Sequence, residues 1–578
     1  MKPPRFSKNG QIAVSILAFV VGAVTAVAII IFRESIAMIQ NVAYGTSSER
    51  LFAHIESIPW WQVVLAPTLG GLLIGIAIKY LLPDERPQGL ADVIESSALR
   101  GGHMLGRVGF KAAVINAASI GFGASVGREA PAVHFGAALA SSMSKYLHLT
   151  QSVSRTLLGC GAAAAVAASF NAPIAGALFA SEVVIGHYAL SAFAPIVIAS
   201  VTGTVISRYY FGDYPAFAIP EHIIESMWEF PAFVVLGVIA GLTAMVFMQA
   251  IMTANDGAQK MPIPGWMRPA VGGLIVGIMA LWFPQVLGVG YGVTEAAVMT
   301  AIPLSMLLAV FVAKICATAI SIGFGFGGGV FSPSLVIGAM LGGAYGTIFT
   351  QMFPDMSTGT GAYTILGMGA VAAAVLGAPI STALIVFEMT SDYALTLALM
   401  VCVVISSMIT KQFHGGSFFT WQLERRGHDL RDGYEMALLK KISVSSVLSD
   451  AIETIGLGVD LPEIRNRLQT SKVGELFVVD NEGRLFGTIT LADMSEFAFD
   501  PELDHLVAAC DVARRQPPML AGDDDLDVAL QVMRESDEDT IAVVDDREEM
   551  KFLGCVREGR VMAAYNKALL DYRRDERG

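Results

Sequence analysis

The sequence predicts an all-α polytopic membrane protein with an internal repeat of short, broken helices, followed by a smaller α+β unit. Of the 578 residues, 54% are hydrophobic and only 15% are charged, a composition typical of a chain that lies mostly in a bilayer. Two motifs recur in the same order along the apolar part, which indicates a duplication. The excess of acidic residues is confined to the end of the chain, which indicates a separate soluble unit.

The duplication is visible as two ordered internal matches. Residues 119–131 read SIGFGASVGREAP and residues 321–333 read SIGFGFGGGVFSP, at a constant offset of 202. Downstream in each half, APIAGALFASE ends at Glu182 and APISTALIVFE ends at Glu388, at an offset of 206. Two matches in the same order predict that the membrane part consists of two related halves, at about residues 11–212 and 213–425. Repeats of this kind in transporters are often inverted across the membrane, and we expect inversion here.

Charge-free stretches long enough to cross a bilayer recur through residues 11–425. The first, 11–32, is too long for the core of a signal peptide and is expected to be a retained first membrane helix. Because Lys and Arg precede it, residues 1–10 are expected to be cytoplasmic. Several later stretches are cut by Gly and Pro, which predicts short helices that enter the membrane from both sides.

A linker is predicted over residues 426–440, before the soluble unit. Between 441 and 578 the chain has 29 Asp and Glu against 16 Lys and Arg, so this unit alone carries the net charge of −13. Two similar stretches of helix followed by strands predict small α+β domains at 441–500 and 501–570. A solvated surface accounts for the acidic charge, and no basic stripe offers a nucleic-acid footprint.

Both copies of the glycine-rich motif suggest anion binding. Each is a loop that leads into an apolar segment with a proline near its start, which is typical of a helix N-terminus. Such an end presents backbone N–H groups and the positive end of the helix dipole, so it binds anions. Two of them predict one anion site built from two half-helices. The alternative, tight glycine-mediated helix packing, fits a single copy of the motif.

These residues resemble the CLC family of chloride channels and proton-coupled chloride exchangers, followed by a tandem pair of CBS domains. GREAP at 127–131 is similar to the family's GREGP, and GGVFSP at 328–333 to its GGIFAP. NAPIAGALFASE at 171–182 looks like the segment before the family's cytoplasmic proton gate. The resemblance implies a homodimer in a lipid bilayer, with one anion pathway in each subunit.

The resemblance also implies where the anion binds. Backbone amides of Val330 and Phe331 would line the central site, next to Gly127 and Arg128. Fixed N–H donors replace the hydration that an anion loses, without a full positive charge that would trap it. Arg128 is therefore expected to set the local field or support the structure rather than to be a direct ligand.

Glu129 is the residue that the sequence singles out most sharply. A carboxylate in an apolar, glycine-rich membrane stretch is costly, so such a residue tends to be paired or functional. By resemblance it is the external gate, whose carboxylate occupies an anion site until it swings out or is protonated. A helix N-terminus favours that carboxylate as it favours chloride. The alternative is a buried ion pair with Arg128.

The matched glutamates and Val183 bear on proton transport. Glu182 and Glu388 occupy equivalent places in the repeat, which predicts a structural role as helix-end partners. In the family's exchangers the internal proton-transfer glutamate follows the position of Glu182, where this chain has Val183. Valine cannot carry a proton, so this departure favours a passive channel. A proton-coupled exchanger that uses other residues is the alternative.

Two further departures concern anion selectivity. Where the family has a GSGIP-like segment, residues 86–92 read RPQGLAD, so that Gln88 stands in place of the usual anion-contacting serine. The pore tyrosine position falls on Phe419, which has no hydroxyl. Chloride is the default anion, and a preference for nitrate or fluoride is the alternative.

In the soluble unit, one nucleotide site is expected at most. GTITLAD at 487–493 looks like the CBS ribose-binding pattern, in which Thr490 and Asp493 would contact ATP or another adenine nucleotide. The second copy, GCVREGR at 554–560, lacks these side chains. A purely structural, dimerising CBS pair is the alternative. The five cysteines are scattered without close pairs, so no metal or required cofactor is expected.

The sequence therefore predicts a voltage- or pH-gated chloride channel of the CLC type, gated by Glu129 and modulated by cytoplasmic CBS domains. A bacterial plasma membrane, with both termini cytoplasmic, is the expected location. A membrane enzyme that uses Glu129 or His134 as acid or base is a rival, but no nucleophile, metal cluster or cofactor loop supports it. A magnesium-type cation channel would require rings of pore carboxylates.

Overall fold

The computed structural model describes residues 9–48, 50–55, 57–186, 190–213, 227–390, 392–427, 442–449, 453–471, 474–495 and 504–577. The chain divides into a helical unit, Met1–His428, and a second unit, Asp429–Gly578, and each is described by itself. Most of the predicted N-terminal segment 1–10 and of the predicted linker 426–440 lies outside the described residues.

Helices form the first unit, and eight among those described are long and apolar enough to cross a membrane. Its α-helices are α1 (Asn9–Tyr44), α2 (Leu51–Ile55), α3 (Trp60–Leu81), α4 (Leu90–Leu99), α5 (Gly106–Gly121), α6 (Glu129–Tyr146), α7 (Gln151–Phe170), α8 (Pro173–Phe179), α9 (Leu190–Phe211), α10 (Phe230–Lys260), α11 (Arg268–Ala280), α12 (Tyr291–Val298), α13 (Leu304–Gly323), α14 (Phe331–Met352), α15 (Thr360–Leu376), α16 (Pro379–Thr390), α17 (Tyr393–His414) and α18 (Phe418–Glu424). Short helical turns are the π-helix η1 (Ala180–Ile185) and the 3₁₀-helices η2 (Met227–Glu229), η3 (Gly265–Met267), η4 (Pro284–Val286) and η5 (Pro354–Met356).

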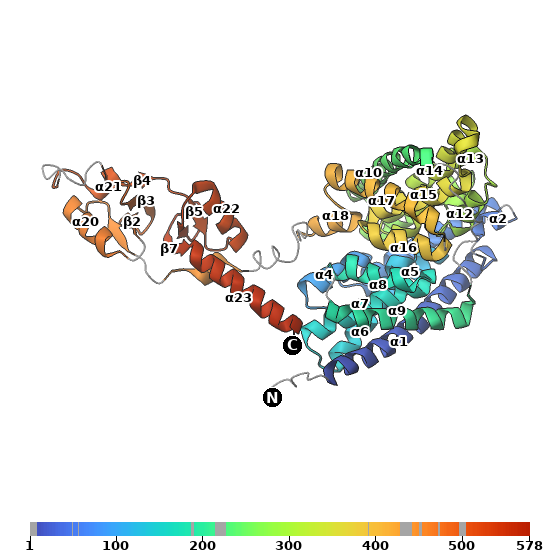
Figure 1. Ribbon diagram of the computed structural model, residues 1–578, viewed down its shortest axis with the longest axis horizontal. Helices are drawn as coiled ribbons and strands as arrows, with labels where there is room; N and C mark the ends of the chain where they lie inside the picture. Colours follow the sequence, from blue (N-terminus) through green and yellow to red (C-terminus); the bar gives the residue numbers. More distant parts are fainter. Residues whose placement is uncertain are drawn as a thin grey trace. The chain divides into compact units, whose positions relative to one another are not determined.

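The order of helices repeats, as the sequence predicts. The series α3 to α9 is matched by α11 to α17, and Figure 1 shows the first half in blue to green beside the second half in yellow-green to orange. Where the halves meet, Gly127 and Gly329, which are equivalent at the offset of 202, form an antiparallel backbone bridge. The two copies of the motif therefore run in opposite directions, as an inverted repeat requires.

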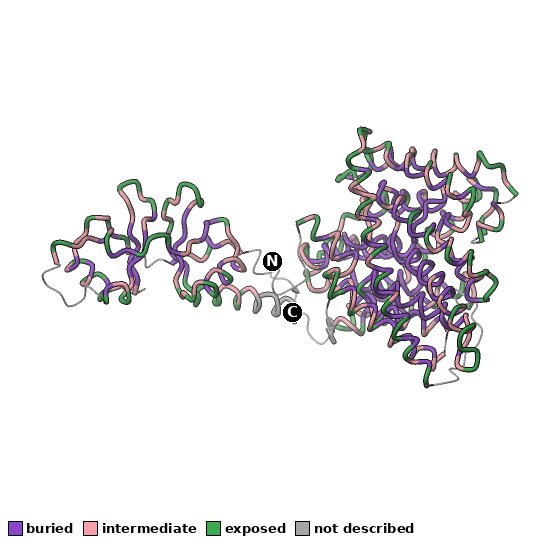
Figure 2. The backbone as a smooth tube through the Cα atoms, turned by 90° about the horizontal axis from the view of Figure 1, so that it is seen from above, coloured by how far each residue is buried: buried purple, intermediate pink, exposed green. Residues whose placement is uncertain are grey.

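Small residues allow the central helices to pack closely. Helix α6 packs on α7, and α14 packs on α15. A Cβ at Gly161 would lie 2.3 Å from the carbonyl oxygen of Gly136, and a Cβ at Gly338 would lie 2.3 Å from that of Gly367. The two crossings use equivalent glycines. Close glycine-mediated packing, the alternative considered for the repeated motif, is therefore present in both halves, and it occurs alongside the paired helix N-termini rather than in place of them. Figure 2 shows the resulting buried interior in purple.

The second unit contains two small sheets that share a topology. Its strands are β1 (Thr454–Gly456), β2 (Glu475–Val479), β3 (Leu485–Thr490), β4 (Arg514–Arg515), β5 (Met519–Ala521), β6 (Thr540–Val544) and β7 (Phe552–Arg557). Its described helices are η6 (Val444–Val447), α20 (Leu461–Thr470), α21 (Ala509–Val512), α22 (Leu526–Ser536) and α23 (Glu558–Arg577). In each sheet a parallel pair, β1 with β2 or β5 with β6, is followed by an antiparallel partner, β3 or β7.

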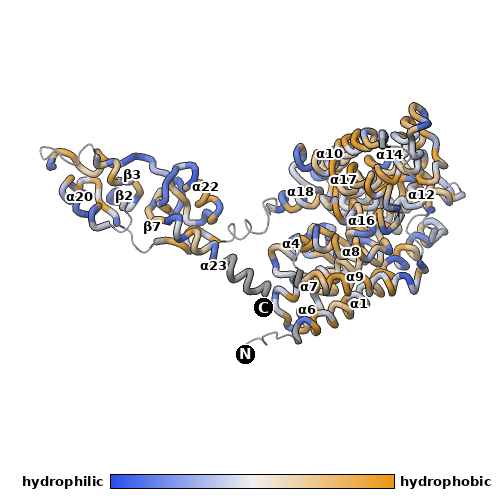
Figure 3. Tube along the Cα trace, viewed as in Figure 1, coloured by the Kyte–Doolittle hydropathy of each residue, from blue (hydrophilic) through white to orange (hydrophobic). Residues whose placement is uncertain are grey.

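The two α+β motifs also pack on each other. The ring of Phe477 on β2 stacks on that of Phe552 on β7, with centroids 4.9 Å apart. The antiparallel pairs carry a register shift at the same place, between Val478 and Val479 and between Val543 and Val544. In Figure 3 the trace of this unit is coloured more hydrophilic than that of the helical unit. This difference agrees with the excess of acidic residues that the sequence has between residues 441 and 578.

Candidate functional site

The two glycine-rich loops bring two helix N-termini together. Helix α6 begins at Glu129 and α14 begins at Phe331, each two residues after the glycines of the bridge. The amide of Gly127 donates to the carbonyl of Gly329 over 2.7 Å, and the amide of Gly329 donates back over 2.9 Å. The positive ends of both dipoles therefore face the same small volume, which favours an anion there.

The carboxylate of Glu129 is buried at this meeting point, with only 1% of the residue exposed. Its Oε1 accepts a hydrogen bond from the hydroxyl of Tyr291, and its Oε2 accepts one from the hydroxyl of Ser332, in the first turn of α14. A Cβ at Gly127 would lie 3.0 Å from both this Oε2 and the backbone nitrogen of Ser332. The side chain thus occupies the space that the helix ends make favourable for an anion.

Arg128 lies beside the carboxylate but at a longer range. Its Nε is 3.8 Å from Oε1 of Glu129, and its guanidinium carbon lies 4.7 Å from the centroid of the Tyr291 ring. The side chain is 9% exposed. The ion pair that the sequence offered as an alternative is therefore present, while hydroxyl groups make the close hydrogen bonds to the carboxylate.

Val330 and Phe331 form the start of α14. Val330 is the N-cap residue and is fully buried. The ring of Phe331 packs against Phe170 at the end of α7, with centroids 5.0 Å apart, and against Phe179 on α8 at 6.3 Å. Aromatic side chains of α7 and α8 therefore pack against the N-terminus of α14, next to the glycine bridge.

The two residues assigned to selectivity lie in different surroundings. Gln88 precedes the N-cap residue of α4, and its carbonyl accepts a hydrogen bond of 3.3 Å from Nδ2 of Asn116. A Cβ at Gly327 would lie 2.2 Å from Oδ1 of that asparagine, so Gln88 is connected to the loop that feeds α14. Phe419 is buried in α18, which packs on α4 and α15, and its ring contacts Phe418.

The matched glutamates confirm the predicted structural role. Glu182 accepts hydrogen bonds from the amides of Ile380 and Ser381, in the first turn of α16, over 3.1 and 2.8 Å. Glu388 accepts from the amides of Ile174 and Ala175, in the first turn of α8, over 2.9 and 2.7 Å. Each half therefore satisfies the helix N-terminus of the other half, where a carboxylate is favourable.

Val183 lies next to Glu182 in the π-helical turn η1 and is half-buried. Its side chain has no group that accepts or releases a proton. His134, the other titratable candidate, is 1% exposed on α6. Among the described residues, neither ring nitrogen of His134 has a hydrogen-bond partner, so no acid–base pair forms through this ring.

Tyr291 and Ser332 are not among the residues predicted from the sequence, although both hydroxyls donate hydrogen bonds to Glu129. Ser332 was detectable as the serine in GGVFSP where the family segment has alanine. Tyr291 begins α12, the counterpart of α4, after the N-cap residue Gly290, which has a left-handed φ of +92°. In the sequence, the feature that could have pointed to Tyr291 is a hydroxyl group within a glycine-rich apolar stretch.

A buried lysine, also unpredicted, holds the loop that leads to Tyr291. Nζ of Lys314 on α13 donates to the carbonyls of Val286 and Gly288, over 3.0 and 2.9 Å. Lys314 is fully buried, and a charged group in such a place requires fixed acceptors. This contact positions the start of α12 and hence the tyrosine hydroxyl.

In the second unit, the predicted nucleotide residues contact each other. Oδ2 of Asp493 accepts hydrogen bonds from the amide and the hydroxyl of Thr490, over 2.8 and 2.7 Å. Near them, burial raises the pKa of Glu475 to about 7, and the charge of Glu538 adds to the rise. Arg514 binds Glu538 over 2.5 Å, and this hydrogen bond raises the pKa of the arginine.

Comparisons with known proteins agree with this architecture. A family profile described as "Voltage gated chloride channel" matches residues 70–411, and the CBS domain profile matches 444–500 and 509–567. A ClcB-like chloride channel protein of Ralstonia nicotianae is 34% identical over 417 residues, covering 72% of this chain and 97% of that protein. A "Voltage-gated ClC-type chloride channel ClcB" of Escherichia coli K12 is 30% identical over 413 residues, covering 70% and 97%.

Solved structures share the fold. A slow cyanobacterial Cl⁻/H⁺ antiporter superposes with a TM-score of 0.65 at 25% identity, covering 72% of this chain and 97% of that one. A eukaryotic CLC transporter superposes with a TM-score of 0.62 at 19% identity, covering 96% and 99%. The second match shows that the fold of both units is shared.

The repeated, broken helices and the paired helix N-termini define a multi-pass membrane transport protein for anions, which is followed by an α+β unit. The chain belongs to the CLC family of chloride channels and transporters and carries a tandem pair of CBS domains. The resemblance and the fold class predicted from the sequence are thereby confirmed.

Proposed function

We propose that this protein conducts chloride passively down its electrochemical gradient and that Glu129 is the gate. The observation that carries the proposal is the position of the Glu129 carboxylate, which lies between the N-termini of α6 and α14. There it accepts hydrogen bonds from Tyr291 and Ser332. A negative group in this place competes with a chloride ion for the positive ends of both helix dipoles.

Opening then requires that the carboxylate leaves or loses its charge. Protonation removes the attraction to both helix dipoles, and a change in membrane potential acts on the same charge. A chloride ion that takes its place is stabilised by backbone amides without being held by a full positive charge. Gating by external pH, by voltage or by both follows from this competition.

Two observations favour conduction over proton-coupled exchange. Val183 stands at the position of the family's internal proton-transfer glutamate and cannot carry a proton. The similar proteins of Ralstonia and Escherichia are described as chloride channels. The alternative, a chloride/proton exchanger, is favoured by the likeness to the cyanobacterial antiporter.

Purified protein in chloride-loaded liposomes distinguishes the two. Chloride efflux and internal pH are recorded together under an imposed potential. We expect chloride efflux without coupled proton movement. Proton movement in a fixed ratio to chloride would instead identify an exchanger with an internal route that avoids Val183. If nitrate or fluoride moves and chloride does not, the assignment of chloride as the transported anion is wrong. Gln88 and Phe419, which replace the family's usual serine and tyrosine, are the reason to test these other anions.

We also propose a homodimer in a bacterial plasma membrane, with CBS domains in the cytoplasm that bias the gate. The adenine-nucleotide site would include Thr490 and Asp493. The ligand would be ATP or another adenine nucleotide, whose ribose hydroxyls an acidic side chain such as that of Asp493 can bind. Calorimetry on the wild type and on Asp493→Ala tests this site, and equal affinity in both would remove it.

A further inference from the structure

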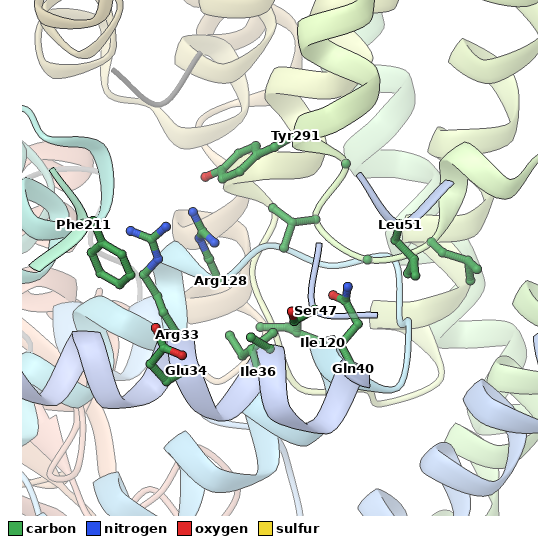
Figure 4. Close-up of a pocket in the computed structure, with 15 residues that line it drawn as sticks. Arg33, Glu34, Ile36, Gln40, Ser47, Leu51, Ile120, Arg128, Phe211 and Tyr291 are labelled. Carbon is green, nitrogen blue, oxygen red and sulfur yellow. The ribbon is translucent and has the colours of Figure 1, made fainter. Parts of the chain in front are cut away.

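Two hollows in the helical unit differ in the charges that line them. The first, of about 280 Å³, adjoins the contacts of Glu129, and its wall includes Arg33, Glu34 and Arg128 (Figure 4). Arg128 is already paired with Glu129 there. The second is an open groove of about 820 Å³ between the end of α3, the start of α5 and the end of α6. The charged residues in its wall are all basic, so this groove has an excess of positive charge.

The basic residues of the groove come from two helices. Arg107 and Lys111 lie one turn apart on α5, and Lys145 lies in the last turn of α6. Nζ of Lys111 donates to the carbonyl of Leu81 at the end of α3, over 3.2 Å. Within the described part of the chain, the side chains of Arg107 and Lys145 have no ion pair or hydrogen bond, and no acidic residue lines the groove. Their charges are therefore available to a ligand.

The start of α5 adds a second feature that favours a negative ligand. Helix α5 begins after the N-cap residue Leu105, whose side chain has no capping group, and its first turn contains no acidic residue. A Cβ at Gly106 would lie 2.0 Å from Oγ of Ser142 on α6, so this glycine allows α5 to begin directly against the helix that carries Lys145. The positive end of the α5 dipole and the basic side chains therefore act on the same space.

The groove lies at the membrane surface, on the side where the helical unit ends. Helix α3 is a candidate membrane span that ends at Leu81, and polar residues follow it at 84–86. Arg426, which follows α18, binds Asp92 in the first turn of the next helix, α4, over 3.1 Å. The end of α3 is therefore on the side where the chain leaves the helical unit, which is the cytoplasmic side in the proposed orientation. Anionic lipid headgroups attract Lys and Arg at that surface.

Exposed apolar side chains continue from the groove along the same helices. On α5, Phe110 and Val114 are 61% and 51% exposed, about one and two turns beyond Arg107. On α3, which packs on α5, Tyr80 lines the groove and Leu73 is exposed two turns before it. Free phosphate makes no use of such a surface, whereas the acyl chains of a lipid cover it. A basic groove beside an apolar surface therefore fits a phospholipid with a negatively charged headgroup.

We propose that this groove binds the headgroup of an anionic phospholipid such as phosphatidylglycerol, whose acyl chains lie along α3 and α5. Arg107 holds phosphate oxygens through parallel N–H donors, and Lys111 and Lys145 supply point charges. Because Lys111 also binds the carbonyl of Leu81, the lipid fixes the end of α3, from which residues 82–89 lead to α4. The inference does not depend on Glu129 being the gate.

The test titrates the full chain, in a neutral detergent, with dioleoylphosphatidylglycerol and counts the bound lipids by native mass spectrometry. In the double variant Arg107→Gln/Lys145→Gln, the dissociation constant of the most tightly bound lipid should rise by about 10- to 30-fold. Each basic residue near an anionic headgroup contributes roughly fivefold in affinity, which accounts for this range. Unfolding temperatures near that of the wild type show that the variants are folded.

Lys260→Gln/Lys411→Gln is the matched control. It removes the same charge from exposed residues in the last turns of α10 and α17, outside the groove. An ion pair of 2.6 Å between Asp256 on α10 and Arg425 places the end of α10 on the same side of the membrane as α18. The dissociation constant of this control should stay within about twofold of the wild type, because charges at a distance are screened.

Three results would overturn the lipid site. Equal losses in the two double variants would indicate a general attraction to basic surface, and no loss in Arg107→Gln/Lys145→Gln would place the lipid elsewhere. Displacement of the lipid by glycerol 3-phosphate at equal concentration would identify a site for free phosphate. The wild type alone gives a further check, since phosphatidylglycerol with a photoactivatable headgroup should cross-link within residues 104–111 or 142–145. Cross-links only outside these segments would exclude the groove.

Discussion

At the scale of single residues, Glu129 is held by groups that lie far away in the sequence. Tyr291 is 162 residues from it and Ser332 is 203 residues from it. Each hydroxyl binds one carboxylate oxygen, so the rotamer of the buried side chain is defined by two hydrogen bonds to a charged acceptor. Hydrogen bonds of this kind contribute about 1.5–3 kcal/mol each.

Replacing Glu129 by glutamine is expected to produce constitutive conduction. The amide has the same size but no negative charge, so the helix dipoles no longer hold it in preference to chloride. Chloride currents across planar bilayers should become independent of external pH. A mutant that still responds to pH as the wild type does would show that the gate lies elsewhere.

Removing a single hydroxyl donor tests how the gate is held closed. Ser332→Ala loses one hydrogen bond to the carboxylate, so the closed arrangement should weaken by about 1.5–3 kcal/mol and chloride flux at neutral pH should rise roughly tenfold or more. Tyr291→Phe is expected to act in the same direction.

Ser334→Ala is the matched control for this substitution. Ser334 is also buried on α14, but its hydroxyl donates to the carbonyl of Val330 within the helix. Its flux should remain near that of the wild type. If Ser332→Ala and Ser334→Ala behave alike, the hydrogen bond to Glu129 does not keep the pathway closed.

At the scale of elements, the short helices α8 and α16 depend on each other's half of the repeat. The N-terminus of α8 is bound by Glu388 and that of α16 by Glu182. Helix α8 has 7 residues and α16 has 12, and isolated helices shorter than about 12 to 15 residues are marginal in water. The exchange of carboxylates therefore joins the halves as well as completing the helices.

Glu182→Gln and Glu388→Gln should both destabilise the helical unit. An amide oxygen accepts hydrogen bonds more weakly than a carboxylate, and each substitution also removes a charge favoured by the helix dipole, at a combined cost of about 1–2 kcal/mol. The unfolding temperature in detergent is the measurement. Because the contacts are equivalent, similar losses are expected, and a large effect from only one glutamate would contradict the symmetric role.

Glu475 gives the second unit a dependence on pH. Burial raises its folded pKa to about 7, above the ordinary value of 4.5 that applies when the unit is unfolded. Between these values the folded state binds the proton and the unfolded state does not, so stability is present below about pH 4.5 and is lost as the pH rises to about 7. One pKa unit corresponds to about 1.4 kcal/mol, so a rise from 4.5 to about 7 places the loss at about 3–4 kcal/mol.

The measurement is hydrogen exchange of peptides from β2 and β3 in the full chain between pH 5 and 8, corrected for the intrinsic pH dependence. Protection should fall with rising pH in the wild type and should fall less in Glu475→Gln. The substitution keeps the size of the side chain and removes its titration. An identical profile in both proteins would assign the pH dependence to other groups.

At the scale of the whole molecule, the helical unit corresponds to the bacterial relatives. The two channel proteins reported above match this chain over 97% of their own length, and the matches cover 70–72% of this chain. These two relatives therefore have little sequence beyond the part that matches this chain. The match leaves more than a quarter of this chain uncovered, a share close to that of the second unit.

Removal of residues after His428 should leave chloride flux in place. The helical unit has its own core, and the pathway residues Glu129, Tyr291 and Ser332 all belong to it. Truncated and full-length proteins are compared in liposomes at equal protein density. Measurable flux that no longer responds to ATP or another adenine nucleotide is the expected result, whereas a folded but inactive truncated protein would make the CBS pair part of the conduction machinery.

The membrane fold, the duplication, the separate acidic unit and the family are all predictable from the order of the amino acids. Composition and ordered motifs are local properties, so they are readable without coordinates. Residues such as Gly127, Glu129 and Phe331 lie within these motifs, and their roles in conduction stay predictions.

The surroundings of Glu129 and the contacts that join the two halves depend instead on how the helices pack. The hydroxyls of Tyr291 and Ser332 reach the carboxylate because the helix N-termini converge. Arg33 shares a cavity with Arg128 because α1 packs beside α6. These contacts join segments up to about two hundred residues apart, and packing of whole helices, rather than any local pattern, brings such segments together.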